Sequence, residues 1–210
     1  MKTLHIQAIS EPSKVQTFAA LTHTLDALPR HPLREMLWFS DGIKPVVAFA
    51  MGYAHNCIYL KFYVQEPQIQ AKYRQTNGPV YKDSCVELFI AFNNEATYYN
   101  LEFNCLGTGL VGFGENRHKR RLLPGSTVER IKTWASLTVD GQATWELTLA
   151  IPAAIFSAHH LSTFEGLRAR ANFYKGGEEL PIPHYLAWNA IQAQQPDFHR
   201  PEFFGELQFA

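Results

Sequence analysis

The sequence carries no excess of charge of either sign. Its 210 residues include 19 Lys and Arg and 19 Asp and Glu, so the formal net charge at pH 7 is zero. Binding to nucleic acid or to an anionic membrane depends largely on a surplus of basic side chains. We therefore predict neither of these partners and expect a ligand that is neutral or recognised by a few local groups.

Long apolar segments and a recognisable leader are also lacking. No stretch approaches the roughly 18 consecutive apolar residues that a membrane-spanning helix needs. The N-terminal stretch MKTLHIQAISEPSKV contains a lysine but no apolar run of signal-peptide length. We expect a soluble protein, either cytoplasmic or the processed form of a secreted or periplasmic protein, and the sequence leaves this choice open.

Cysteine is scarce. The chain has three, Cys57, Cys85 and Cys105, each inside an apolar, strand-like stretch. An odd number without CxxC spacing argues against a disulfide framework and against a zinc site. We expect three buried, reduced thiols, and no catalytic residue, metal site or cofactor is predicted from these residues.

Strand-like segments, rich in β-branched and aromatic residues and separated by turn residues, make up most of the chain. The expected strands cover residues 4–9, 46–56, 57–66, 80–92, 97–106, 109–114, 134–140, 144–151, 167–175, 185–191 and 205–209, with a turn at 41–45, a hairpin turn at His55 and Asn56 and a helical turn after Pro152. One helix is expected over 14–28, capped by Ser13 and ended by Pro29 and Pro32. Without βαβ alternation or repeats, this pattern predicts one domain over residues 1–210, an all-β, antiparallel, jelly-roll-like β-sandwich with one N-terminal helix.

Alternation leaves polar rows on some strand faces. In YYNLEFNCL, Asn100, Glu102 and Asn104 alternate with apolar residues, and in LRARANFYK the polar set is Arg168, Arg170, Asn172 and Tyr174. An ordinary solvated face is one explanation. A second is a polar groove that these faces share with Glu87.

Glu87 lies in the apolar strand CVELFIAF, where a carboxylate is costly unless hydrogen bonds or an arginine stabilise it. Tyr81, Tyr185 and Trp188 could supply flat apolar surfaces at the rim of such a groove, although core packing would also explain each of them. A sugar needs this mixture, because its C–H face packs on an aromatic ring and its hydroxyls hydrogen-bond to planar polar groups.

Three segments, VYKDSCVELFIAF, YYNLEFN and LRARANFYK with a following tryptophan, resemble in order and spacing the family 9 carbohydrate-binding modules and, more loosely, the wider group of DOMON-type sandwiches. The resemblance runs from about residue 35 to the C-terminus. It implies a β-sandwich that clamps the end of a glucan or xylan chain between two aromatic rings. It also allows a structural calcium ion, although no DxDxDG loop is present.

The resemblance implies a set of carbohydrate-binding residues. The first aromatic is Tyr81, where the family has a tryptophan, and the carboxylate beside it is Glu87. The remaining positions are Asn100 and Glu102 in place of an arginine and an asparagine, Arg170 and Asn172, and a second aromatic at Tyr174 or Trp188. The differences in residue type leave the identity of the sugar open.

We predict non-catalytic binding of the end of an oligo- or polysaccharide, associated with polysaccharide breakdown, and make no prediction of oligomeric state. One alternative is a glycoside hydrolase that uses Glu87 and Glu102 as an acid and base pair. Another is haem binding by Met51 and His55, which one strand would hold too close together to ligate iron from opposite sides. The basic run ENRHKRRLLPG (115–125) is either a solvated loop or part of the groove's rim.

The C-terminal stretch QPDFHRPEFFGELQFA concentrates charged and aromatic residues. Asp197 and His199 have a DxH spacing, but Pro196 and Pro201 bracket them and no third metal ligand is near. We interpret the stretch as a rigid approach to the last strand, with Phe203, Leu207 and Phe209 entering the core. Replacing His199 with Ala is then expected to lower stability and to spare ligand affinity.

Overall fold

The computed structural model describes residues 1–10, 18–38 and 45–210, and most of its regular structure is β-strand. The strands are β1 (Thr3–Ala8), β2 (His31–Pro32), β3 (Glu35–Met36), β4 (Val46–Ala54), β5 (Cys57–Glu66), β6 (Cys85–Phe92), β7 (Tyr98–Asn104), β8 (Gly109–Gly114), β9 (Arg120–Leu122), β10 (Lys132–Asp140), β11 (Gln142–Pro152), β12 (Arg168–Gly176), β13 (Leu186–Ala187) and β14 (Gly205–Phe209). The helical elements are α1 (Phe18–Asp26), α2 (Gly125–Val128) and the 3₁₀ turns η1 (Val80–Lys82), η2 (Ala153–Ile155) and η3 (Pro201–Phe203). None of the helices in the described part is long and apolar enough to cross a membrane.

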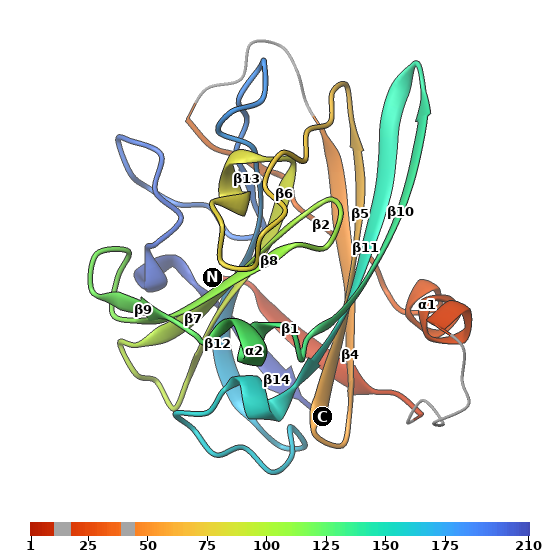
Figure 1. The fold of residues 1–210 in the computed structure, drawn as a ribbon. Helices are drawn as coiled ribbons and strands as arrows, with labels where there is room; N and C mark the ends of the chain where they lie inside the picture. Colours follow the sequence, from red (N-terminus) through yellow and green to blue (C-terminus); the bar gives the residue numbers. More distant parts are fainter. Residues whose placement is uncertain (11–17, 39–44) are drawn as a thin grey trace.

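The strands follow the order β10-β11-β5-β4-β1-β14-β12-β6-β7-β8-β9 and form two facing layers (Figure 1). Strands β10, β11, β5 and β4 belong to one layer, and α1 lies on its outer side. Strand β1 joins the layers, because residues 3–6 pair with β14 and residues 7–8 pair with β4. The predicted all-β sandwich is confirmed. Strand β1 departs from the expected antiparallel arrangement, since it runs parallel to both of its neighbours.

The main core lies between the layers, where alternation along the strands sends the apolar side chains. From β6, β7 and β12 come Val86, Leu88, Ile90, Tyr99, Leu101, Phe103, Ala171 and Phe173, all buried. The Phe173 ring stacks on Phe49 of β4 with a centroid distance of 3.7 Å. The expected division of β7 and β12 into an apolar and a polar face is therefore confirmed, and their polar faces lie on the far side of the layer.

A buried ion pair ties the two layers together at one end. Glu66 of β5 lies with its Oε2 2.9 Å from Nζ of Lys175 on β12, and neither side chain is exposed. Trp145 donates its indole N–H to Glu66 Oε1 at 2.7 Å, and His184 Nε2 lies 3.2 Å from Oε2. Burial raises the pKa of Glu66, but Lys175 and the hydrogen-bond donors outweigh it, so the pKa falls to about 2.

Several element predictions need correction. Residues 80–82 form η1 and not the start of β6, because Pro79 begins a 3₁₀ turn in which Lys82 N donates to its carbonyl. Only Leu186 and Ala187 of the expected strand 185–191 pair as β13. The sequence analysis did not predict β2, β3, β9 or α2. The helix is described from Phe18 onwards, whereas Ser13, Val15 and most of the expected turn at 41–45 lie outside the described residues.

The cysteines are free thiols, as predicted, although Cys57 is only partly buried. Burial raises the pKa of the Cys57 thiol to about 11 and that of Cys105 to about 12. The pKa of Cys85 is raised well above the ordinary value by its complete burial. All three thiols thus stay protonated at neutral pH, which fits structural cysteines.

Candidate functional site

A cavity of about 320 Å³ opens on the face of β6 and β7 that points away from the main core. This volume is near the lower end of the roughly 300–1,000 Å³ of small-molecule sites. The cavity is lined by Trp38, Tyr81, Glu87, Glu102, Arg117, His118, Arg120, Gly176, Glu178, Tyr185, Pro196, Asp197, Phe198 and His199. Segments far apart in the sequence therefore build it together.

Two carboxyl groups form the floor of the cavity. Glu87 of β6 and Glu102 of β7 are direct partners in the antiparallel register, so their side chains project from adjacent positions on the same face. Their residues are only 3% and 2% exposed. Two neighbouring buried carboxyls repel each other when both are ionised, and this makes the charged state of each depend on its partners.

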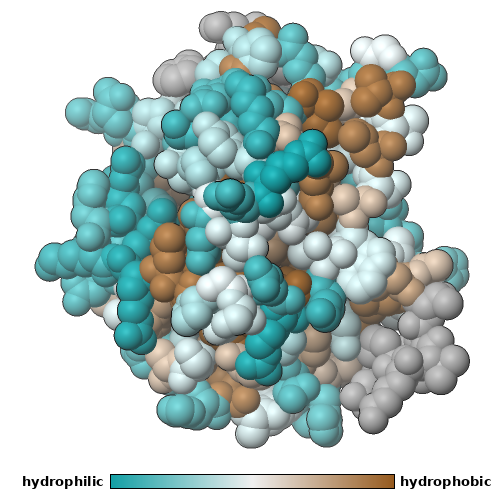
Figure 2. Space-filling view, in the orientation of Figure 1, coloured by the Kyte–Doolittle hydropathy of each residue, from teal (hydrophilic) through white to brown (hydrophobic). Residues whose placement is uncertain are grey.

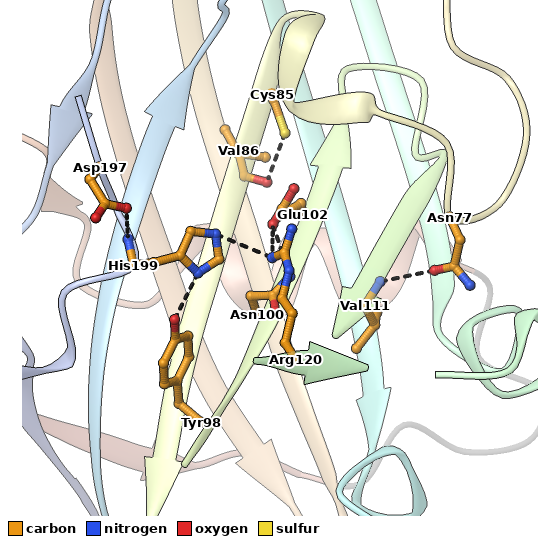
Figure 3. A network of polar contacts seen from close by, with 10 residues as sticks. All are labelled: Asn77, Cys85, Val86, Tyr98, Asn100, Glu102, Val111, Arg120, Asp197 and His199. Carbon is orange, nitrogen blue, oxygen red and sulfur yellow. Dashed lines mark hydrogen bonds and ion pairs between the residues drawn. The ribbon is translucent and has the colours of Figure 1, made fainter. Parts of the chain in front are cut away.

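Glu102 has partners within the protein (Figure 3). Arg120 of β9 donates Nη1–H to Glu102 Oε1 at 3.1 Å, and Asn100 donates its amide Nδ2–H to the same oxygen at 2.8 Å. Burial raises the pKa of Glu102, while the Arg120 guanidinium acts against that rise. The arginine thus stabilises the ionised form of this carboxyl.

Glu87 has no hydrogen-bond partner among the described residues. Burial, and then the negative charge of Glu102, raise its pKa well above the ordinary value of a glutamate. Gly176 leaves the space beside it open, because a methyl group added there would lie 3.7 Å from Glu87 Oε1 and 3.4 Å from the Phe198 ring. A buried carboxyl at the floor of a cavity, with no hydrogen-bond partner in the described part of the chain, is ready to receive a hydrogen-bond donor from a ligand.

The segment before β14 supplies another wall. His199 lies with Nδ1 2.7 Å from Tyr98 Oη and Nε2 3.2 Å from Arg120 Nη1 (Figure 3). Burial first, and then the nearby Arg120 charge, lower the pKa of His199 to about 3. Asp197 accepts a hydrogen bond from the His199 backbone N–H at 3.0 Å and so fixes the local turn.

Trp38, Tyr185 and Phe198 form an aromatic wall. The ring of Trp38 meets Tyr185 edge-on at 5.5 Å between centroids and lies 5.8 Å from Phe198. Trp38 donates its indole N–H to the Ala193 carbonyl at 2.8 Å, and Tyr174 stacks on Phe198 at 4.2 Å from behind. These contacts hold the rings in place before any ligand arrives.

The KDS motif before β6 explains why Tyr81 stands at the cavity. The buried Asp83 carboxylate accepts hydrogen bonds from the backbone N–H groups of Lys72 and Tyr73, at 2.9 and 3.0 Å. Ser84 Oγ accepts one from Gln70 N at 3.1 Å. These bonds bind the 70–73 loop to the start of β6 and fix η1, which carries Tyr81, beside Glu87.

The structure brings only some of the predicted site residues together. Tyr81, Glu87 and Glu102 line the cavity, as does Tyr185, which the sequence analysis placed at the rim. Asn100 and Tyr174 are fully buried directly behind lining residues, where they contact Glu102 and Phe198.

The other three predicted residues lie elsewhere. Trp188 was expected at the rim but packs edge-on against Phe173 in the main core. The buried Asn172 side chain binds the backbone of Asn189 through both its oxygen and its nitrogen. Arg170 donates to the carbonyl oxygens of Glu95 and Pro201. The polar groups of Arg170 and Asn172 are thus engaged in hydrogen bonds that hold loops to β12.

Several residues that line the cavity were not predicted from the sequence. Residues 196–199 line the cavity, so the interpretation of the C-terminal stretch only as an approach to the last strand is wrong. The expected entry of Leu207 and Phe209 into the core is confirmed, whereas Phe203 is only partly buried and packs against a smaller apolar cluster. Arg117, His118 and Arg120 come from the basic run 115–125, for which a place at the rim was one of the two expectations. Trp38 and Glu178 had no local signal.

The residues considered for haem do not share a site. Met51 is buried in the main core, and His55 is exposed in the β4–β5 turn, where it adopts a φ of 51°. Among the described residues, no group of three or more His, Cys, Asp and Glu side chains is arranged to hold a metal ion.

Comparisons with known proteins bear on the chain as a whole. A family model described as carbohydrate-binding family 9 matches residues 19–209. A crystal structure of a protein from Bacteroides uniformis to which carbohydrate binding is ascribed has a TM-score of 0.92 and 31% identity, covering 100% of this chain and 99% of that one. No curated protein shows significant similarity to the chain.

Two further structures show a carbohydrate-binding module of family 9 from Caldicellulosiruptor kristjanssonii. The complex with cellotriose has a TM-score of 0.63 and 13% identity, covering 99% of this chain and 93% of that one. The complex with glucose has a TM-score of 0.64 and 13% identity, covering 100% and 96%. At this identity the two structures share the fold with the chain, and they say nothing about its side chains.

Proposed function

The chain belongs to carbohydrate-binding family 9, and from this we propose that it binds carbohydrate without catalysis, in the cavity above Glu87 and Glu102. One observation carries the assignment to this cavity: carboxyl groups, a guanidinium and aromatic rings converge in about 320 Å³. That space suits one or a few sugar rings, so the ligand is the end of an oligo- or polysaccharide.

Each kind of side chain has a role in this proposal. The apolar face of a sugar ring packs on Tyr81 or on the aromatic wall, whose rings are held by their own contacts. Sugar hydroxyls donate to Glu87, which lacks a partner in the described protein, and accept from Arg120. A hydrogen bond from the charged Arg120 guanidinium contributes about 1.5–3 kcal/mol, and Arg120 and Glu87 are the main polar determinants in this proposal.

The position of the two glutamates favours binding over hydrolysis. In glycoside hydrolases the acid and the second carboxylate flank the bond that is cleaved. Glu87 and Glu102 are register partners on neighbouring strands and lie side by side on one floor. Glu102 is also engaged by Arg120 and Asn100, which reduces its ability to exchange protons.

Isothermal titration calorimetry tests the proposal, starting with glucose and cellotriose, the ligands of the Caldicellulosiruptor structures, and continuing with hits from a glycan array. Trp38→Ala and Glu87→Gln should each weaken binding about tenfold or more. Trp134→Ala is the matched control, because this tryptophan is 41% exposed on β10 and does not line the cavity.

A reducing-sugar assay on the same ligands distinguishes binding from hydrolysis. Binding without product release agrees with the proposal. If the two cavity variants fold normally and bind a hit glycan as tightly as the parent, the assignment to this cavity is wrong.

A further inference from the structure

The two edge strands, at the ends of the described strand order, differ in how well they are protected against pairing with a further strand. Strand β9 has three residues, two of them arginines, and Pro124 follows it closely, so it offers little backbone for further pairing. Strand β10, at the other end, has nine residues. Its interior, TWASLTV (133–139), contains no charge, proline or glycine. Natural proteins rarely leave an edge strand of this kind open.

Strand β10 also exposes apolar side chains. Leu137 is 43% exposed and Val139 is 66% exposed, whereas their partners on β11, Trp145 and Ala143, are buried. Figure 2 shows hydrophobic surface at the upper right, where Figure 1 places β10. A backbone edge that no described strand pairs with and an apolar surface thus occur together on β10.

We propose that β10 pairs antiparallel with β10 of a second copy of the chain, around a two-fold axis at Ser136. In this register Lys132 lies opposite Asp140 of the second copy, and the symmetry forms the same pair twice. The inner residues pair as Thr133 with Val139, Trp134 with Thr138, and Ala135 with Leu137. Strand β10 is therefore complementary to itself in charge, which a two-fold interface requires.

The charges select this register. In an antiparallel pair, residues that lie opposite each other must point to the same face of the sheet. The two-fold axis can therefore lie only at a residue and not between two residues. An axis at Ala135 would place Lys132 opposite Thr138, and one at Leu137 would place Asp140 opposite Trp134. Only the axis at Ser136 pairs both charges, and neither Lys132 nor Asp140 forms an ion pair with a described residue of its own chain.

The pairing leaves the cavity unchanged, because none of the residues that line it belongs to β10. The dimer presents two copies of the cavity. This inference rests on the edge strand alone and is independent of what the cavity binds.

Charge reversal tests the register. Lys132→Asp and Asp140→Lys each place like charges opposite each other twice per dimer, and sedimentation velocity should show dimer dissociation constants at least about tenfold higher than the parent. The double variant K132D/D140K restores both pairs and should regain the parent value. Arg34→Asp changes the net charge as Lys132→Asp does, at an exposed position outside β10, and should leave the dimer intact.

Cross-linking gives a second readout. In the proposed dimer the two Ser136 residues face each other with Cβ atoms about 5 Å apart, so Ser136→Cys should form an intermolecular disulfide on mild oxidation. Thr138→Cys lies on the same face, but its two copies are roughly 14 Å apart and should not cross-link. A chain that stays monomeric at several hundred micromolar, a dimer indifferent to charge reversal, or equal cross-linking of both variants would overturn the proposal.

Discussion

Arg120 donates a hydrogen bond to His199, with Nη1 3.2 Å from Nε2 of the imidazole. A guanidinium can only donate, so Nε2 must carry a lone pair and the ring proton must be on Nδ1. Nδ1–H then points to Tyr98 Oη at 2.7 Å. His199 is therefore neutral in the folded protein, in agreement with a pKa lowered to about 3 by burial and by Arg120.

The neutral His199 predicts how stability depends on pH. Its folded pKa of about 3 lies below the ordinary value of 6.5. Between pH 3 and pH 6.5 the unfolded chain binds more protons than the folded protein does. The contribution of His199 to stability is therefore present above pH 6.5 and is lost as the pH falls towards 3. The free energy of unfolding should fall by up to about 1.4 kcal/mol per pH unit on this account.

Urea denaturation at several pH values checks this prediction with His199→Gln. The variant should lose most of that slope, and His118→Gln, at an exposed position of the same cavity, should keep it. Equal slopes for parent and His199→Gln would contradict the prediction. Because His199 contacts Arg120 and lines the cavity, we expect its loss also to weaken sugar binding several-fold, in contrast to the expectation from the sequence that affinity would be spared.

Glu87 should show a conflict between stability and binding. Its folded pKa is raised, so its favourable contribution is present below the unfolded pKa and is lost as the pH rises through the folded value. Glu87→Gln mimics the protonated form and removes the preference of this carboxyl for the unfolded state, where it ionises freely, so the free energy of unfolding at pH 7 should rise by on the order of 1–3 kcal/mol. The same variant should bind sugar about tenfold more weakly.

Thermal denaturation and calorimetry at pH 7 measure both effects. Glu165→Gln, at an exposed position away from the cavity, should change neither. A Glu87→Gln variant that is less stable than the parent at pH 7 would show that the carboxylate is stabilised by groups other than those described.

Arg120 should be required for both stability and affinity. Arg120→Met removes the cation that stabilises the ionised form of the buried Glu102, at a cost of roughly 1.5–3 kcal/mol in the free energy of unfolding. The double variant E102Q/R120M also removes the carboxylate that would be left without a counter-ion, and it should recover most of the lost free energy of unfolding. Sugar affinity should remain low in both, because the guanidinium that contacts the ligand is missing. Recovery of affinity in the double variant would show that Arg120 acts only through the fold.

The local pattern of the sequence predicts which face of a strand is buried, and for β7 and β12 the structure confirms this prediction. Alternation in β7 predicts that Leu101 enters the core and that Glu102 lies opposite, because the side-chain period of a strand depends only on the strand. The cost of a carboxylate among apolar neighbours likewise singled out Glu87. Both statements need no knowledge of the partner strand.

The partners of these residues could not be predicted in the same way. Arg120 reaches Glu102 only because a basic run forms β9 and pairs with β8, and this pairing depends on contacts distant in sequence. Tyr185 and Trp188 lie three residues apart around β13 and point to opposite faces, so Tyr185 lines the cavity and Trp188 packs in the core. The 196–199 segment has two nearby prolines and no periodicity, so its path over the sheet has no local signal.

The buried pair of Glu66 and Lys175 gives the last prediction. Lys175→Met should lower the free energy of unfolding at pH 7 by about 3–5 kcal/mol, because Glu66 would remain ionised and buried without a counter-ion. In the double variant E66Q/K175M neither charge of the pair remains, and the amide oxygen of the introduced glutamine would still accept the indole N–H of Trp145. The double variant should therefore be more stable than Lys175→Met alone.

Chemical denaturation of the parent, both single variants and the double variant gives the coupling free energy of the pair. The pH dependence supplies an independent check, because the folded pKa of about 2 is below the ordinary 4.5. The contribution of Glu66 is present above pH 4.5 and is lost as the pH falls towards 2, so the parent should lose stability there and E66Q/K175M should lose less. Additive costs of the two single variants, with no recovery in the double variant, would mean that the two charges do not stabilise each other across the layers.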